Sequence, residues 1–375
     1  RAVAYASCLF HHALDGNLDH SLTVQRLRRV EEVMEEAGER VEEHHTLVYG
    51  LVYRALVEGR VDESYERLVA ALEQDDPWMR AMVRLLLGLL DVLAGRVGLS
   101  MERASTALEE FRACGDTWGQ CQALAQAADA QRFGDLRRCG ELLDEGMRLA
   151  EDTALRGMAT MFRIRRAQVL TDLGELEAAR RDLRALFDGQ EPIEREHMSL
   201  LWLSEAHWLR EAGDLEGARA VLDRVGTSLP ELDGLSPLYI EAAWRSQLAI
   251  VQWMSGEAEA AWRENGRSWW LAVRGLGPVC AEILDVFVMM SAEKDPERAA
   301  VLLGHSEALR GVPDTATPYV VRAREQARRA LGEDEYLHLV GRGREVGAER
   351  ALRLVSRWLA PIVPDTGPGK EDGHL

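Results

Sequence analysis

Two pairs of adjacent histidines are the first candidates for a chemical site in this sequence. They are His11–His12 and His44–His45, in a chain that contains 10 histidines. Neighbouring residues on a helix point about 100° apart, so adjacent histidines cannot share one metal ion, whereas residues four apart can. The spacing indicates structural or surface histidines, and we expect no metal site.

Acidic pairs and a glycine-rich segment could support acid–base or phosphate chemistry, but their surroundings do not suit it. The pairs Asp75–Asp76 and Glu42–Glu43 fall at predicted turns or on the outer sides of helices. The segment GRGREVG (341–347) lacks the strand, turn and helix of a phosphate-binding loop, and no GxxxxGK[ST], GxSxG or HExxH motif occurs. We expect neither an enzyme nor a cofactor site in this chain.

The composition favours a globular cytoplasmic protein that does not hold nucleic acid directly. The 375 residues are 47% hydrophobic and 29% charged, with a formal net charge of −18. Phosphate backbones are bound mainly through Lys and Arg, which disfavours a nucleic-acid partner here. The five cysteines lie far apart without a CxxC motif, as is typical of reduced thiols. No segment reaches the roughly 18 apolar residues of a membrane span, so no membrane partner is expected.

A repeated turn organises the rest of the chain. Its positions are Gly16, Gly59, Gly95, Gly134, Gly174, Gly213, Gly256 and, in the eighth unit, Asp295. These turns are about 40 residues apart, a period that indicates stacked supersecondary units. Five residues after the turn stand only small side chains: Ser21, Ser64, Ser100, Cys139, Ala179, Ala218, Ala261 and Ala300. Seven residues before it stand Gly88, Ala127, Ala167, Ala206 and Ala249.

The physical meaning of this pattern is a helix, a tight turn and a second helix packed closely on the first. Glycine takes the left-handed conformation that ends the first helix at little cost. Small residues on both sides of the turn allow the two antiparallel helices to approach each other. The sequence therefore predicts an all-α fold, an α-solenoid of about eight helix–turn–helix repeats with a C-terminal helical cap.

The same spacing resembles that of tetratricopeptide repeats, and Trp202 falls at the early tryptophan position of that family. The resemblance covers about residues 1–310, although the family's closing proline is absent and the period exceeds the usual 34 by about six. Such longer repeats are similar to those in the sensor regions of large bacterial ATP-dependent transcription regulators. We expect a superhelix over 1–311, capping helices within 312–360, including helices near 333–340 and 347–359, and a disordered tail over 361–375.

In the tetratricopeptide fold the first helix of each unit lines the concave groove, so candidate binding residues can be read from their distance to the turn. This reading selects Tyr49, Tyr53, Met82, Leu85, Cys121, Met161, Ile164, Gln168, Leu203, His207, Ser246 and Trp253. The wall is apolar with isolated polar points at Gln168, His207 and Ser246, which is typical of small-molecule pockets. The alternative is a tightly wound superhelix whose inner faces pack on one another.

The segment after the last repeat carries a second resemblance. The stretches RAAVLLGHSEALR, RAREQARRALGEDEY and GAERAL resemble the C-terminal closure of actinomycete regulators that carry tetratricopeptide arrays. The start at Arg1 and the polar tail PDTGPGKEDGHL suit the antibiotic regulatory protein (SARP) type, whose DNA-binding and nucleotide-binding domains come first. They suit the LuxR type less, because its DNA-binding domain comes last. The resemblance implies the C-terminal repeat domain of a SARP-type regulator, with ATP bound only by the absent nucleotide-binding domain.

Two functions remain open at this point. In the first, the groove binds a small effector or a partner and thereby controls the regulator's own N-terminal domains. In the second, the array is an effector-independent scaffold that docks another protein chain or forms oligomers, as solenoids commonly do. Neither function involves direct contact with nucleic acid or a membrane.

Overall fold

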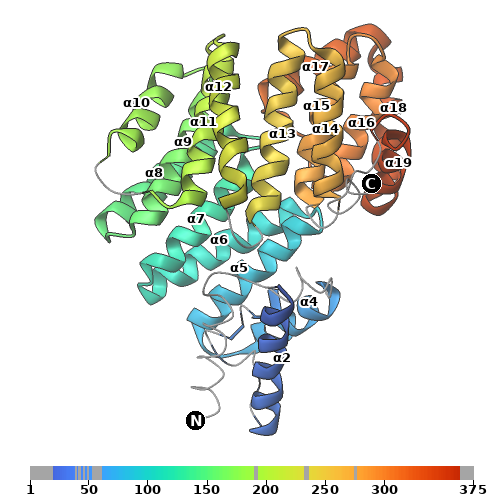
Figure 1. The fold of residues 1–375 in the computed structure, drawn as a ribbon. Helices are drawn as coiled ribbons and strands as arrows, with labels where there is room; N and C mark the ends of the chain where they lie inside the picture. Colours follow the sequence, from blue (N-terminus) through green and yellow to red (C-terminus); the bar gives the residue numbers. More distant parts are fainter. Residues whose placement is uncertain are drawn as a thin grey trace, which may run out of the picture.

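The chain forms a curved array of antiparallel helix pairs, as Figure 1 shows for the computed structural model. The structure describes residues 20–38, 40, 44, 47, 48, 50–52, 61–189, 193–231, 236–273 and 277–363. The helices are α2 (His20–Glu36), α4 (Val61–Ala70), η2 (Ala71–Glu73), α5 (Pro77–Leu93), α6 (Val97–Cys114), α7 (Thr117–Gln131), α8 (Leu136–Asp152), α9 (Arg156–Asp172), α10 (Leu176–Phe187), α11 (Arg195–Glu211), α12 (Leu215–Ser228), η3 (Leu229–Glu231), α13 (Ser236–Met254), α14 (Ala258–Ala272), α15 (Gly277–Ser291), α16 (Pro296–Arg310), α17 (Pro318–Leu331), α18 (Glu333–Glu345) and α19 (Ala348–Leu359). No strand occurs within these ranges, and the predicted all-α solenoid of paired helices is confirmed.

Four of the predicted turn glycines end a helix in the left-handed conformation. They are Gly95, Gly174, Gly213 and Gly256, with φ values of 70°, 76°, 87° and 83°. In each case the following residue reaches back to the last helical turn, as where the Glu175 N–H donates to the Leu170 carbonyl at 2.8 Å. This arrangement is the Schellman motif, in which a positive φ favours glycine. The turns predicted at Gly16 and Gly59 lie outside the described residues.

The turn at Gly134 differs from this prediction, because Gly134 does not have a positive φ. There the Asp135 N–H donates to the Gln131 carbonyl at 2.9 Å. The eighth turn closes in the same way, since the Asp295 N–H donates to the Ser291 carbonyl at 2.8 Å. This second turn type needs no left-handed residue, which explains how an aspartate can stand at the eighth position.

The small residues of the repeat are buried where helices pack together. Those described after the turn are 4% exposed or less: Ser64, Ser100, Cys139, Ala179, Ala218, Ala261 and Ala300. Those before the turn, Gly88, Ala127, Ala167, Ala206 and Ala249, are buried as well. Larger side chains at these places would separate the helices, so the spacing read from the sequence reflects helix contact.

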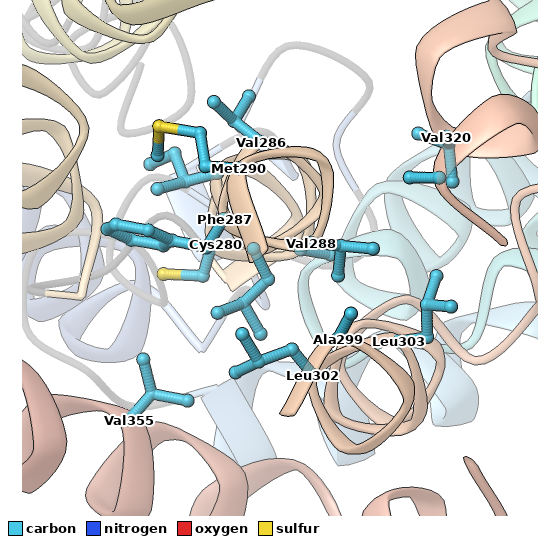
Figure 2. Packing of buried hydrophobic residues seen from close by; sticks show 14 of the residues in the cluster. Cys280, Val286, Phe287, Val288, Met290, Ala299, Leu302, Leu303, Val320 and Val355 are labelled. Carbon is cyan, nitrogen blue, oxygen red and sulfur yellow. The ribbon is translucent and has the colours of Figure 1, made fainter. Parts of the chain in front are cut away.

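The hydrophobic core is divided into clusters that follow one another along the array. One cluster of buried residues runs from residue 48 to residue 169, and another runs from 242 to 359. Two smaller clusters join α9, α10 and α11, and then α11, α12 and α13. Figure 2 shows part of the C-terminal cluster, in which Phe287 of α15 lies near Leu302 of α16 and Val355 of α19. Each pair is therefore stabilised mainly by its neighbours, as in other repeat proteins.

The helices after α16 pack back onto the last pair. Helix α18 crosses α16, and α17 and α19 also contact α16. Helix α18 continues to Glu345, beyond the predicted end at residue 340, so that Gly341 and Gly343 lie inside the helix. The domain limits at 311 and 360 stay predictions, and of the predicted tail only 361–363 is described.

Candidate functional site

The first helix of each pair forms the inner side of the array. Successive first helices, such as α9, α11, α13 and α15, pack more closely against one another than successive second helices do. Their packing places the second helices on the outer side of the curve. We call the side made by α5, α7, α9, α11, α13, α15 and α17 the inner face.

The array closes on itself, because its last pair touches its first complete pairs. A Cβ atom added to Gly311, which follows α16, would lie 1.8 Å from the carbonyl oxygen of Gly95. Nearby, the Thr315 N–H donates to the Phe133 carbonyl at 2.8 Å. We call this contact the seam, formed by 95–96 and 132–133 on one side and by Glu282 and 309–315 on the other.

Five polar residues meet on the inner face, and we call them the inner cluster: Asp129, Arg132, Arg165, Tyr239 and Glu282. Asp129 lies on α7 and Arg132 caps its end, while the others come from α9, α13 and α15. The four charged members all interact electrostatically with the Tyr239 phenol. The cluster therefore joins two successive repeats, those of α7 and α9, to two others that lie much later in the sequence, those of α13 and α15.

The charges of the inner cluster are arranged as two ion pairs. Arg132 contacts Glu282 at 2.6 Å, and Arg165 contacts Asp129 at 3.2 Å. Burial alone would lower the pKa of Arg132, but Glu282, Tyr239 and Asp129 outweigh that effect and raise it. The Arg132 guanidinium therefore stays charged, and each arginine of the inner cluster is matched by one carboxylate.

The inner cluster is enclosed by protein and still open to water. Burial is the largest cause that raises the pKa of Tyr239, yet 41% of this residue is exposed. The side chains of Arg132 and Glu282 are 36% and 41% exposed. The inner cluster is thus reached by solvent on the inner face.

Two tyrosine hydroxyl groups are available for hydrogen bonding there. Tyr319, at the start of α17, interacts electrostatically with Asp285 and Glu282, and burial is the main cause that raises its pKa well above the ordinary value. Both Tyr239 and Tyr319 are therefore protonated at neutral pH. Among the described residues neither hydroxyl has a hydrogen-bond partner, so both can donate to a bound molecule.

A buried ion pair supports the inner face next to the seam. Arg310 donates to Asp285, and the Ser306 hydroxyl donates to the same carboxylate at 2.7 Å. The guanidinium groups of Arg310 and Arg132 both lie over the Phe133 ring, 4.5 and 4.6 Å from its centroid. Asp285 and Glu282 are one helical turn apart, so α15 presents a carboxylate to each arginine.

The groove residues predicted from the sequence are not brought together at one place. Six of them are buried: Met82, Leu85, Cys121, Ile164, Leu203 and His207. Four are half-buried, Met161, Gln168, Ser246 and Trp253, and the remaining two, Tyr49 and Tyr53, lie outside the described residues. The ten that are described are spread along the array, from α5 to α13. Their role in binding stays a prediction.

Two of the predicted polar points already have protein partners. His207 contacts Asp172 at 3.1 Å, and the Ser246 hydroxyl donates to Asn265 at 3.2 Å. The sequence reading missed the inner cluster, although the same rule applied to the eighth unit selects Glu282 and Asp285, at 13 and 10 residues before Asp295. Arg132 and Arg165 stand at other distances from their turns and carry no such signal.

Three of the described cysteines are buried and have unreactive thiols at neutral pH. Burial raises the pKa of Cys121 to about 11 and those of Cys139 and Cys280 to about 12, so these thiols are protonated at neutral pH. In the described ranges no group of three or more His, Cys, Asp or Glu side chains is placed to hold a metal ion. No helix among the described residues is long and apolar enough to cross a membrane.

Comparison with known proteins supports the fold alone. No protein-family model matches the sequence, and no curated protein matches it either. Among solved structures, a Rap protein complexed with competence and sporulation factor has a similar fold, with a TM-score of 0.53 and 12% sequence identity. The match covers 96% of this chain and 99% of the Rap chain. This chain is thus a helical-repeat protein of tetratricopeptide-like architecture.

Proposed function

We propose that this chain is the interaction domain of a SARP-type transcription regulator. In this proposal the inner cluster binds a partner segment or a small effector, and binding there controls the DNA-binding and nucleotide-binding domains of the same regulator. The observation that supports it is the inner cluster, where side chains from α7, α9, α13 and α15 converge on the inner face and remain open to water. A ligand held by four repeats changes their relative positions if it prefers one arrangement of them.

The chemistry of the inner cluster favours a polar ligand. An apolar molecule would remove the partly exposed Arg132–Glu282 ion pair from water without offering it hydrogen bonds, and taking charges out of water is costly. A ligand with its own donors and acceptors can use the free Tyr239 and Tyr319 hydroxyls without that cost. The Rap protein of similar fold, solved with competence and sporulation factor, is a precedent for binding by such an array.

The test is calorimetric titration of this chain with the separately expressed N-terminal domains of the regulator and with candidate metabolites. We expect Tyr239→Phe or Arg165→Ala to weaken binding about tenfold, which corresponds to the loss of one hydrogen bond in a desolvated site. The matched control is Arg219→Ala, which removes an ion pair with Glu257 on the outer helices. Equal effects of the inner and outer substitutions would contradict the proposal.

A second candidate function is the effector-independent scaffold. It is favoured by the burial of the predicted apolar wall, since Met82, Leu85 and Ile164 are occupied in helix packing. In this case the N-terminal domains or a second protein chain bind with measurable heat, and no metabolite does. Analytical ultracentrifugation of the chain alone separates this function from self-association.

A further inference from the structure

The seam and the inner cluster share two residues, Arg132 and Glu282. Arg132 belongs to the inner cluster and, through its ion pair with Glu282, also joins the first part of the array to the last. We infer that the seam is a latch, and that a carboxylate-bearing ligand opens it by replacing Glu282 as the partner of Arg132. The inference rests on the proposed binding role of the inner cluster. It adds that the ligand carries a carboxylate and that its binding opens the seam.

The seam can separate without exposing a hydrophobic core. The two large clusters of buried hydrophobic residues end at residue 169 on one side and begin at residue 242 on the other, and neither spans the seam. What the seam contains is the Arg132–Glu282 ion pair, the Thr315–Phe133 hydrogen bond, the contact of the Arg310 guanidinium with the Phe133 ring and a close backbone approach. The partly exposed Arg132–Glu282 ion pair and the single hydrogen bond contribute little net free energy, so a competitor for Arg132 weakens the seam at this point.

A carboxylate is the group best suited to compete at this place. Arginine binds carboxylates through two parallel hydrogen bonds, and the Arg132 guanidinium is accessible to solutes. The neighbouring arginine is not available, because Arg310 is buried with Asp285. A ligand that takes Arg132 leaves Glu282 unpaired, so it binds the open array better than the closed one and shifts the population towards it.

The latch itself is tested with a pair of glycine substitutions. Gly311→Ala places a methyl group 1.8 Å from the Gly95 carbonyl oxygen, whereas Gly174→Ala meets no atom within 4 Å. Both glycines have a positive φ, 83° and 76°, so both substitutions carry the same backbone strain. We expect only Gly311→Ala to increase the radius of gyration in small-angle X-ray scattering. A radius equal to that of Gly174→Ala overturns the latch.

The charge pair is tested by hydrogen exchange of the segment 311–317, whose Thr315 amide is protected by Phe133. We expect Glu282→Gln to raise exchange there about tenfold, and the exchanged pair Arg132→Glu with Glu282→Arg to restore protection. If Glu282→Gln leaves hydrogen exchange of 311–317 at the wild-type rate, the seam is not held by this charge pair. The same follows if the double variant with swapped charges does not restore protection.

The role of the carboxylate is tested with succinate as the probe and with succinamide as its uncharged analogue. Succinate raises exchange of 311–317 several-fold in the wild-type chain, succinamide does not, and Arg132→Gln removes the response. An identical effect of both compounds overturns the role of the carboxylate. A regulator partner that binds at the inner cluster and leaves this exchange unchanged overturns the latch while the proposed function stands.

Discussion

Gly304 of α16 and Gly343 of α18 lie face to face where the two helices cross. A Cβ atom on Gly304 would lie 2.2 Å from the Val340 carbonyl oxygen, and one on Gly343 would lie 2.3 Å from the Val301 carbonyl oxygen. The neighbouring His305 bonds through Nδ1 to the Gly343 carbonyl at 2.8 Å. The crossing therefore needs the absence of side chains on both helices, and it fixes the capping helices to the last pair.

Gly343→Ala is expected to destabilise the chain by about 2 kcal/mol, the usual cost of overpacking a close contact. Gly341→Ala is the matched control, because it lies in the same helix and a Cβ there meets nothing within 4 Å. Alanine favours a helix more than glycine does, so the control gains up to about 1 kcal/mol. Urea denaturation of both variants measures the difference. Equal stability would show that α16 and α18 do not cross at these glycines.

The same glycines show where sequence reading stops. A glycine at a turn cannot be told from a glycine at a helix crossing by sequence alone, and the helix predicted near 333–340 stops just before GRGREVG. The helix continues because Gly343 serves a contact with α16, which lies about forty residues earlier in the chain. The repeats themselves were predictable, since Ala179 and Ala218 mark contacts between helices that are adjacent in the sequence.

The inner cluster was hidden for a related reason. Arg132 and Glu282 meet only because the array curves until its last pair reaches its first complete pairs. Small differences in angle between successive pairs add up to that curvature, and no single repeat records it. The predicted groove residues such as Met82 and Ile164 were placed correctly on first helices, but the pattern did not show that they are buried between them.

The tryptophans of α14 hold the end of the chain. The indole N–H of Trp269, a fully buried residue, donates to the Ser356 hydroxyl at 3.0 Å, and that of Trp270 donates to the Val363 carbonyl at 2.8 Å. We expect a double-mutant cycle of Trp269→Phe and Ser356→Ala to give a coupling free energy of about 1 kcal/mol. Thermal or urea unfolding measures it. Strictly additive losses would contradict the bond.

The described cysteines are expected to react very unequally with alkylating reagents. Cys114 is exposed, whereas Cys121, Cys139 and Cys280 are buried and have raised pKa values. Because the thiolate is the reactive form, iodoacetamide at pH 7.5 modifies Cys114 about 100-fold faster than the other three. Peptide mapping by mass spectrometry follows each site, with the urea-unfolded chain as control. Rapid alkylation of folded Cys280 would be inconsistent with its burial.

Asp285 makes the stability of the chain depend on pH. Burial raises its pKa from 3.8 to about 6, although Arg310 opposes the shift. The folded chain therefore binds this proton more tightly than the unfolded chain does. The resulting stability is fully present below the unfolded pKa and is lost as the pH rises through about 6. Two pKa units correspond to about 3 kcal/mol, which is the upper bound of the effect.

Asp285→Asn removes this titration, because the amide keeps the size of the carboxyl group and cannot ionise. Above about pH 6 the variant lacks the charged partner of Arg310 that the wild-type chain has. Between pH 4 and 7, however, the free energy of unfolding of the wild-type chain falls relative to that of the variant, by up to about 3 kcal/mol. Urea denaturation at half-unit pH steps measures both profiles. Two parallel profiles would mean that Asp285 titrates alike in the folded and unfolded chains, and the buried pair next to the seam would then not respond to pH.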